Sequence, residues 1–272
     1  MEKYHDWRDP YTGIHPFLPA AGGVSVLGAV LAVVRLPLVL ALLAVWLLLD
    51  AALPPLRGVW GWLLGRPLLL VAGCWLSRST RGSPPRGSLL FCAHKSYWDA
   101  LVAAALWSPA WYVHVFGERL VAHGSLLSCL LFVAVARSPS GRATRPLAAL
   151  KQLSGRVVCF VEGATSNHEK CLLRLDDGVA PALDALGLAS SFAVIAYTAK
   201  AVAFAGLNES LPGHVFRALT VPWQSVRVLQ MGEDAAGFEA GWDKLALASG
   251  HRRVNKGWAD KDTFRERYCG GQ

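Results

Sequence analysis

Charged residues are scarce in this chain. Of its 272 residues only 17% are Asp, Glu, Lys or Arg, whereas 53% are hydrophobic, which excludes an intrinsically disordered protein. The length suits one domain of ordinary size with an appendage. Acidic residues are the scarcer kind: 19 against 27 basic ones leave a net charge of +8, and the mean hydropathy is positive. This balance is more typical of a protein that meets anionic lipid or phosphate than of an ordinary soluble enzyme.

The six cysteines form no CxxC pair. Cys74, Cys92, Cys129 and Cys159 lie inside apolar runs, so we expect buried, reduced thiols in a cytosol-facing protein and no metal site. We also expect no secretory signal, because the first 19 residues mix acidic with basic residues and lack a basic start that leads directly into an apolar stretch.

Signatures of several other classes of protein are missing. The chain has no GxSxG elbow of a serine hydrolase, no HExxH zinc motif and no GxGxxG after a predicted strand. The segment 82–87 has the glycine spacing of a P-loop, but it lacks the lysine and contains two prolines. No signature of a nucleic-acid-binding module is present, so nucleic acid is not expected as a partner.

Long apolar stretches dominate the first third of the chain. Residues 22–49 are almost wholly apolar and are interrupted by Arg35 and Pro37. A second stretch, residues 59–76, is interrupted by Arg66 and Pro67. About 20 apolar residues span a bilayer as a helix. A central Arg, however, costs about 2.5–3.5 kcal/mol, and a proline permits a kink. The pattern therefore favours a membrane-embedded helical hairpin over residues 22–76, with two apolar core helices of a soluble domain as the alternative.

Charge and composition suggest where the parts of the chain meet. No acid occurs from residue 51 to residue 98, and short basic flanks of this kind stay on the cytosolic side of a membrane. A segment rich in Pro and Gly then separates the apolar part from the rest. We expect a polar arm (1–21), the hairpin (22–76), a basic linker (77–88), a catalytic domain (89–250) and a charged tail (251–272).

From residue 89 onward, short apolar runs alternate with helix-like segments. This alternation predicts an α/β fold with a largely parallel central sheet flanked by helices. The predicted strands are Leu89–Cys92, Trp111–Val115, Phe132–Ala136, Val157–Val161, Phe192–Tyr197 and Val226–Leu229. The predicted helices are Asp99–Trp107, Arg145–Leu153, Val179–Leu186, Ala235–Ala248 and Asp260–Arg267.

A histidine and an aspartate follow the first of these predicted strands. His94 lies just after the strand, and Asp99 opens the next helix five positions on. Ligands of open α/β sheets bind outside the carboxyl ends of the strands. An imidazole there can act as a general base when a carboxylate orients it. A surface histidine beside a helix-capping aspartate is the alternative.

Polar residues follow two further predicted strands. Glu162 and Gly163 come after one strand and are followed by the hydroxyl groups of Thr165 and Ser166. Arg137 ends another strand, and a guanidinium matches the geometry of a phosphate. A polar turn and a solvated basic loop are the alternatives. Three polar strand ends on one edge of a sheet nevertheless favour a common site.

These blocks resemble those of the PlsC-type glycerolipid acyltransferases. Residues 94–99, H-K-S-Y-W-D, are similar to the family's H-x-x-x-x-D block, and residues 162–167, E-G-A-T-S-N, to its E-G-T block. Arg137 falls between them, where the family has its phosphate-binding arginine. The order and spacing fit over about residues 88–200. Segments of residues 7–19 are also similar to fungal lysophosphatidic acid acyltransferases of the endoplasmic reticulum and lipid droplets.

The resemblance implies a glycerol-3-phosphate acyltransferase-like fold and an acyl-CoA-dependent acyltransferase. Its acceptor would be a lysophospholipid, with lysophosphatidic acid favoured, and acyl-CoA would be a co-substrate with no further cofactor. His94 would be the general base and Asp99 would orient it. The implied substrate-binding residues are Ser96, Arg137, Glu162, Gly163 and Thr165. Membrane lipid would be a further partner, at the endoplasmic reticulum or a lipid droplet, with the catalytic domain facing the cytosol.

Two positions depart from the family's pattern. Ala93 stands where an Asn commonly precedes the motif histidine, and Ala193 lies in an apolar run that usually carries a Pro. They leave open a non-catalytic membrane or lipid-droplet protein that keeps the fold as a binding module. A membrane-bound hydrolase that uses His94 and Asp99 is a third alternative, for which the sequence places no nucleophile.

Overall fold

The computed structural model describes residues 6–17, 24–81, 89–135, 144–166, 171–198, 210–232 and 237–270. Its strands are β1 (Cys74–Arg81), β2 (Leu89–Cys92), β3 (Trp111–Phe116), β4 (Arg119–His123), β5 (Arg145–Pro146), β6 (Val157–Phe160), β7 (Cys171–Leu172), β8 (Ser190–Tyr197), β9 (Gln224–Gly232) and β10 (Arg252–Arg253). Its α-helices are α1 (Val26–Ala52), α2 (Arg57–Trp60), α3 (Arg66–Val71), α4 (Asp99–Trp107), α5 (Leu126–Val135), α6 (Val179–Asp184), α8 (Leu211–Leu219), α9 (Phe238–Ser249) and α10 (Trp258–Gly270). Short 3-10 or π turns are η2 (Pro54–Leu56), η3 (Gly61–Gly65) and η4 (Leu147–Gln152).

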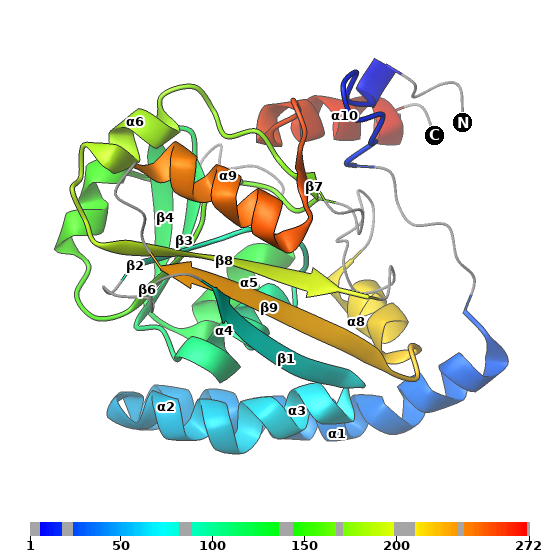
Figure 1. The fold of residues 1–272 in the computed structure, drawn as a ribbon. Helices are drawn as coiled ribbons and strands as arrows, with labels where there is room; N and C mark the ends of the chain where they lie inside the picture. The colour runs from blue at the N-terminus through cyan, green and yellow to red at the C-terminus, as the bar shows by residue number, and fades with distance from the viewer. Residues whose placement is uncertain are drawn as a thin grey trace.

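A mixed sheet forms the centre of the fold, with the strand order β1-β9-β8-β2-β6-β3-β4-β5 (Figure 1). The four strands β8, β2, β6 and β3 run parallel. β9 runs antiparallel to β8, and β4 runs antiparallel to β3 after a tight turn in which Gly117 has a φ of +57°. The α/β class with a central sheet flanked by helices is confirmed, although the sheet is mixed and its parallel part is limited to the centre and β1–β9.

Helices cover both faces of this sheet. Every residue of β2 and β6 is buried, as expected for parallel strands enclosed on both sides. Alternate residues of a strand point to opposite faces of the sheet. On one face, side chains that include Leu90 and Phe160 pack with α1, α3, α4 and α5. On the opposite face, side chains that include Phe91 pack with α6 and α9. The strand ends between these two layers are therefore shielded from bulk water.

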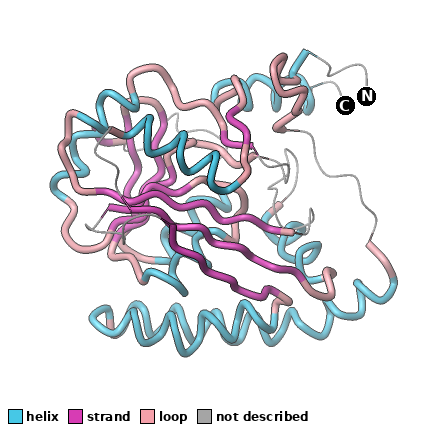
Figure 2. The backbone as a smooth tube through the Cα atoms, viewed as in Figure 1, coloured by secondary structure: helices cyan, strands magenta, loops and turns pink. Residues whose placement is uncertain are grey.

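The apolar N-terminal part folds as two helical rods that run in opposite directions (Figure 2). α1 continues through Pro37 without a break, and the chain then returns along it through α2, η3 and α3. Near the reversal, the guanidinium of Arg57 lies 3.0 Å from the carboxylate of Asp50. Farther along, the Trp46 ring packs so closely on Gly65 that a Cβ there would lie 2.6 Å from it. Only glycine at this position allows the two helical segments to approach so closely.

Hydrogen bonds from Arg35 link the middle of α1 to the rest of the protein. The guanidinium of Arg35 donates to the carbonyl oxygens of Leu219, Val221 and Pro222 at distances of 3.2, 2.6 and 2.6 Å. These carbonyls lie at the carboxyl end of α8 and just beyond it, where helix carbonyls lack partners within the helix. The charge of Arg35, which opposes deep insertion of α1 in a bilayer, is therefore hydrogen-bonded to carbonyl oxygens inside the protein.

One long side of α1 remains uncovered. α1 is long and apolar enough to cross a membrane, by length and composition. Its exposed apolar side chains include Val26, Leu27, Val30, Val33 and Val34. Ala32, Val39 and Trp46 are buried against the domain, so α1 lies along the domain with one side packed and the other open (Figure 1).

Several elements differ from those predicted. The predicted strand Phe132–Ala136 is wrong as far as it is described, because residues up to Val135 belong to helix α5. An apolar run of five residues fits a buried helix as well as a strand. Residues 77–81 of the expected linker belong to β1, which pairs with β9 about 150 residues away. Residues 145–153 form a short strand and a 3-10 turn instead of an α-helix.

Other elements agree closely. β2 and α4 have the predicted bounds, and β3, β6, β8, β9, α6, α9 and α10 overlap their predicted ranges. β4 and α8 were not predicted. The division of the chain into domains remains a prediction.

We expect Arg35→Met to lower the free energy of unfolding by about 1.5–3 kcal/mol, because three carbonyl oxygens lose a charged donor. Chemical unfolding in detergent micelles, followed by tryptophan fluorescence, measures this change. Arg66→Met is the matched control, since Arg66 is exposed on α3. Equal stability of the two variants would contradict the proposed docking of α1 through Arg35.

Candidate functional site

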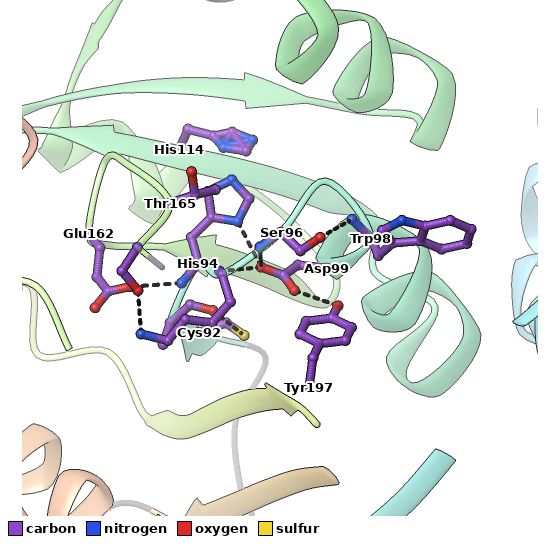
Figure 3. A network of polar contacts seen from close by, with 12 residues as sticks. Cys92, His94, Ser96, Trp98, Asp99, His114, Glu162, Thr165 and Tyr197 are labelled. Atoms are coloured by element: carbon purple, nitrogen blue, oxygen red, sulfur yellow. Dashed lines mark hydrogen bonds and ion pairs between the residues drawn. The ribbon is translucent and has the colours of Figure 1, made fainter. Parts of the chain in front are cut away.

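The carboxylate of Asp99 organises the segment that follows β2. Asp99 begins α4 and is fully buried. Its Oδ2 accepts hydrogen bonds from the backbone N–H groups of Lys95, at 2.6 Å, and Ser96, at 2.9 Å. The same oxygen lies 2.9 Å from Nδ1 of His94 (Figure 3). Its Oδ1 accepts from the hydroxyl of Tyr197, at 2.7 Å. The carboxylate thus fixes both the backbone and the ring of the histidine block.

This arrangement sets the tautomer of His94. A carboxylate only accepts hydrogen bonds, so the proton of a neutral imidazole lies on Nδ1 and faces Asp99. Nε2 then carries the lone pair on the far side of the ring. In Figure 3, Thr165 and His114 lie on that side. His94 is 8% exposed, and this Nε2 faces away from Asp99, which is the arrangement of a candidate general base.

Aromatic rings surround the His94 imidazole. The centroid of its ring lies 4.8 Å from that of Phe160 and 5.5 Å from that of His114. Burial lowers the pKa of His114 well below its ordinary value, and the neighbouring His94 and His123 lower it further. His114 is therefore a neutral neighbour, and it does not add a positive charge beside His94.

Glu162 holds the histidine block from the other side. Its Oε2 accepts from the backbone N–H of His94 at 2.9 Å, and its Oε1 accepts from the N–H of Leu173 at 2.6 Å. Burial raises the pKa of this carboxyl, while the charge of Lys95 and the two N–H donors oppose the rise. Gly163 follows with a φ of +64°, and a Cβ there would lie 2.7 Å from the carbonyl oxygen of Val115. Only glycine fits this turn.

The hydroxyl groups of the site are held by cationic or histidine side chains. The buried Lys95 ammonium donates to Oγ of Ser166, at 2.7 Å, and to the carbonyl oxygen of Cys171. Oγ of Ser96 lies 3.3 Å from Nε2 of His214, which is buried on α8. Thr165 accepts from Lys261 of α10 through its carbonyl oxygen, at 2.8 Å, and its hydroxyl, at 2.6 Å.

The structure brings together most of the residues singled out from the sequence. His94, Asp99 and Glu162 are linked by hydrogen bonds, and Gly163 and Thr165 lie in the turn after Glu162. Ser96 lies within the same block as His94. Arg137 and Asn167 lie outside the described residues. Among the residues with described structure, no group of three or more His, Cys, Asp or Glu is arranged to hold a metal ion.

Sequence reasoning missed several residues that complete the site. Tyr197 ends a predicted strand, and its position at a strand end was a usable signal. His114 and His214 lie within apolar segments, so their proximity to His94 and Ser96 follows only from the fold. Lys261 lies almost 100 residues after Thr165 in a charged segment that gave no indication of its partner.

Fold and site together define the class: a mixed α/β protein with a buried His–Asp pair at the carboxyl ends of its parallel strands. Over 129 residues the chain is 35% identical to a Schizosaccharomyces pombe protein named "Putative lysophosphatidic acid:oleoyl-CoA acyltransferase". The match covers 40% of this chain and 43% of that relative, so it spans less than half the length of the relative. No protein-family model and no solved structure matches the chain. The chain is therefore similar, over part of its length, to a protein that bears the name of a lysophospholipid acyltransferase.

We expect Tyr197→Phe to lower the free energy of unfolding by about 1.5–3 kcal/mol, because a buried carboxylate oxygen of Asp99 loses a donor. Thermal and denaturant unfolding measure the loss. Tyr11→Phe is the control, since Tyr11 is 87% exposed and its hydroxyl can be replaced at little cost. If both variants are as stable as the unmodified protein, the Tyr197 hydroxyl does not support Asp99.

Proposed function

We propose that the protein is an acyl-CoA-dependent lysophospholipid acyltransferase with lysophosphatidic acid as its favoured acceptor. The observation that carries this proposal is the buried contact of 2.9 Å between Nδ1 of His94 and the carboxylate of Asp99. The name of the Schizosaccharomyces pombe relative supports the acceptor and the acyl donor. Arg137 also suits a bare phosphate, because a guanidinium pairs with phosphate oxygens bidentately.

The reaction needs one base and no covalent enzyme intermediate. Nε2 of His94 takes the proton of the acceptor hydroxyl while the hydroxyl oxygen attacks the thioester carbonyl carbon. The carbon–sulfur bond then breaks, and the thiolate of CoA takes the proton back from the imidazolium. The products are the new ester and free CoA. Asp99 orients the ring and stabilises the imidazolium that forms between the two steps.

The remaining residues bind and shape the acceptor side. Arg137 would hold the phosphate of the lysolipid, and the turn at Gly163 and Thr165 would lie along the glycerol end. Ser96 would support the acceptor side from inside the protein, because its Oγ lies 3.3 Å from Nε2 of His214 and accepts from the N–H of Trp98 at 3.3 Å. Glu162 acts on the backbone of His94, so its role is to hold the two strand ends together.

The exposed side of α1 supports a membrane-associated enzyme. We propose that the hairpin of α1 and α2–α3 enters one leaflet sideways, because Arg35 keeps α1 fastened along the domain. Exposed Arg66 and Arg78 would face anionic headgroups, at about 1 kcal/mol for each charge near the surface. The membrane of the endoplasmic reticulum or the surface of a lipid droplet, with the domain in the cytosol, fits such an arrangement.

The direct test is an acyl-transfer assay with the full chain in mixed micelles. Radiolabelled acyl-CoA is offered with lysophosphatidic acid, lysophosphatidylcholine, lysophosphatidylethanolamine or glycerol 3-phosphate, and products are separated by thin-layer chromatography. We expect labelled phosphatidic acid as the main product. Release of free fatty acid without transfer would indicate the hydrolase alternative. Lipid binding without either reaction would indicate the non-catalytic alternative.

We expect His94→Ala to lose about 10²–10⁴-fold in transfer rate, the usual contribution of a general base. The fold should persist, as judged by circular dichroism and thermal unfolding. His251→Ala is the matched control, since His251 is also 8% exposed but lies between α9 and β10. An unchanged rate in His94→Ala would overturn the mechanism.

A triple change of exposed α1 residues, Val30→Glu, Val33→Glu and Val34→Glu, should abolish flotation with vesicles of phosphatidylcholine and phosphatidylserine. These side chains contribute little to the core, so the domain should stay folded. Leu247→Glu on α9 is the control, because Leu247 is 85% exposed outside the hairpin. Flotation of the triple variant at the level of the control would contradict insertion of α1.

A further inference from the structure

The N-terminal arm and helix α10 lie side by side in the fold (Figure 1). The arm at residues 6–17 packs on helix α10, where Phe264 is fully buried. The rings of Trp7, His15 and Phe17 surround Phe264, with centroid distances of 5.3, 5.1 and 6.1 Å. The arm is therefore a docked part of the fold.

Asp9 fixes the arm by hydrogen bonds. Its carboxylate accepts from the backbone N–H and the hydroxyl of Thr12, each at 2.7 Å, and from the N–H of Asn255 at 2.7 Å. Burial acts to raise the pKa of Asp9, but these hydrogen bonds outweigh it, so the pKa is lowered. The contact with Asn255 joins the arm to the segment between β10 and α10. The arm and α10 thus form one unit, which we call the terminal cap (residues 6–17 and 255–270).

The terminal cap reaches the turn after Glu162 at two points. Trp258 packs on Gly163, where a Cβ would lie 3.3 Å from the Trp258 side chain. Lys261 donates from its ammonium to the carbonyl oxygen and the hydroxyl of Thr165, at 2.8 and 2.6 Å. Ala164 packs against the same apolar cluster as Phe264. Successive residues of the turn are thus held by α10.

We propose that Lys261 is a positioning residue for the acceptor-binding turn, and that the terminal cap completes the acceptor side of the site. This inference rests on the proposed acyltransferase function. Lys261 acts through Thr165, which lies in the turn between Glu162 and Ser166. Glu162, at the start of the same turn, holds the backbone of His94, and the N–H of Ser166 lies 3.4 Å from the His94 carbonyl oxygen. A shift of this turn would therefore move the acceptor relative to the base.

The surroundings of Lys261 affect its charge. Burial lowers the pKa of its ammonium to about 7, with Arg265 lowering it further and Asp262 opposing. Near neutral pH the side chain is therefore an amine about as often as an ammonium, and both forms carry N–H groups that can donate to the two oxygens of Thr165. Displacement of a reacting group by about 1 Å can cost about 10²-fold in rate. The placement of this turn therefore affects the rate of a reaction between two bound substrates.

The test compares Lys261→Met, Lys261→Arg and the control Lys151→Met, since Lys151 is exposed on η4. In the full-length protein we expect Lys261→Met to raise the KM for lysophosphatidic acid about tenfold, because the acceptor is held less well. We also expect a lower kcat, because a displaced acceptor reacts more slowly with the base. The KM for acyl-CoA should change less than about twofold. Lys261→Arg should recover most of the loss, because a guanidinium also donates to two oxygens.

Two further measurements separate this inference from the proposed function. Thr165→Val combined with Lys261→Met should be little worse than either change alone, since both remove one interaction. Hydrogen–deuterium exchange of residues 162–173 should rise in Lys261→Met and stay unchanged in Lys151→Met, and this measurement needs no activity. Unchanged exchange together with an unchanged acceptor KM would overturn the role of Lys261. Absence of transfer in the unmodified protein would overturn the proposed function, while the exchange result would still decide the positioning role.

Discussion

The site depends on the hydrogen bonds that the buried carboxylate of Asp99 accepts. The carboxylate receives two backbone N–H groups, one imidazole and one phenol, from the segment after β2 and from the end of β8. A buried charge is costly unless hydrogen bonds replace its hydration. These donors replace the hydration of the Asp99 carboxylate, and the same hydrogen bonds fix the positions of the donors. The orientation of His94 is thus a consequence of how Asp99 is accommodated at the start of α4.

A second buried acid places the same block relative to the rest of the sheet. Glu162 accepts from the backbone of His94 and from Leu173, so it joins the ends of β2 and β6 to the segment after β7. The Lys95 ammonium bridges Ser166 and the Cys171 carbonyl. Buried polar networks of this kind stabilise a single arrangement only when each member is satisfied. Polar atoms are paired on both sides of the histidine, which favours a single arrangement of the site.

The sequence predicted the polar residues at strand ends well, because abrupt ends of apolar runs mark the edge of a sheet. The positions of His94 and Glu162 followed from this pattern, and α4 was found with its exact bounds. The pattern could not find β1, since its pairing with β9 depends on residues 150 positions away. It could not distinguish helix α5 from a strand, because a short apolar run has no clear period. The partners Tyr197 and Lys261 come from distant elements, so they required the fold.

In the proposed reaction, His94 and Asp99 act as one unit. A double-mutant cycle measures whether they do, with transfer rates for His94→Ala, Asp99→Asn and the double variant under saturating substrates. When two residues act as a unit, removal of the second costs little once the first is gone. We therefore expect the double variant to be about as slow as His94→Ala alone. Losses that multiply across the two changes would show that the two residues act independently.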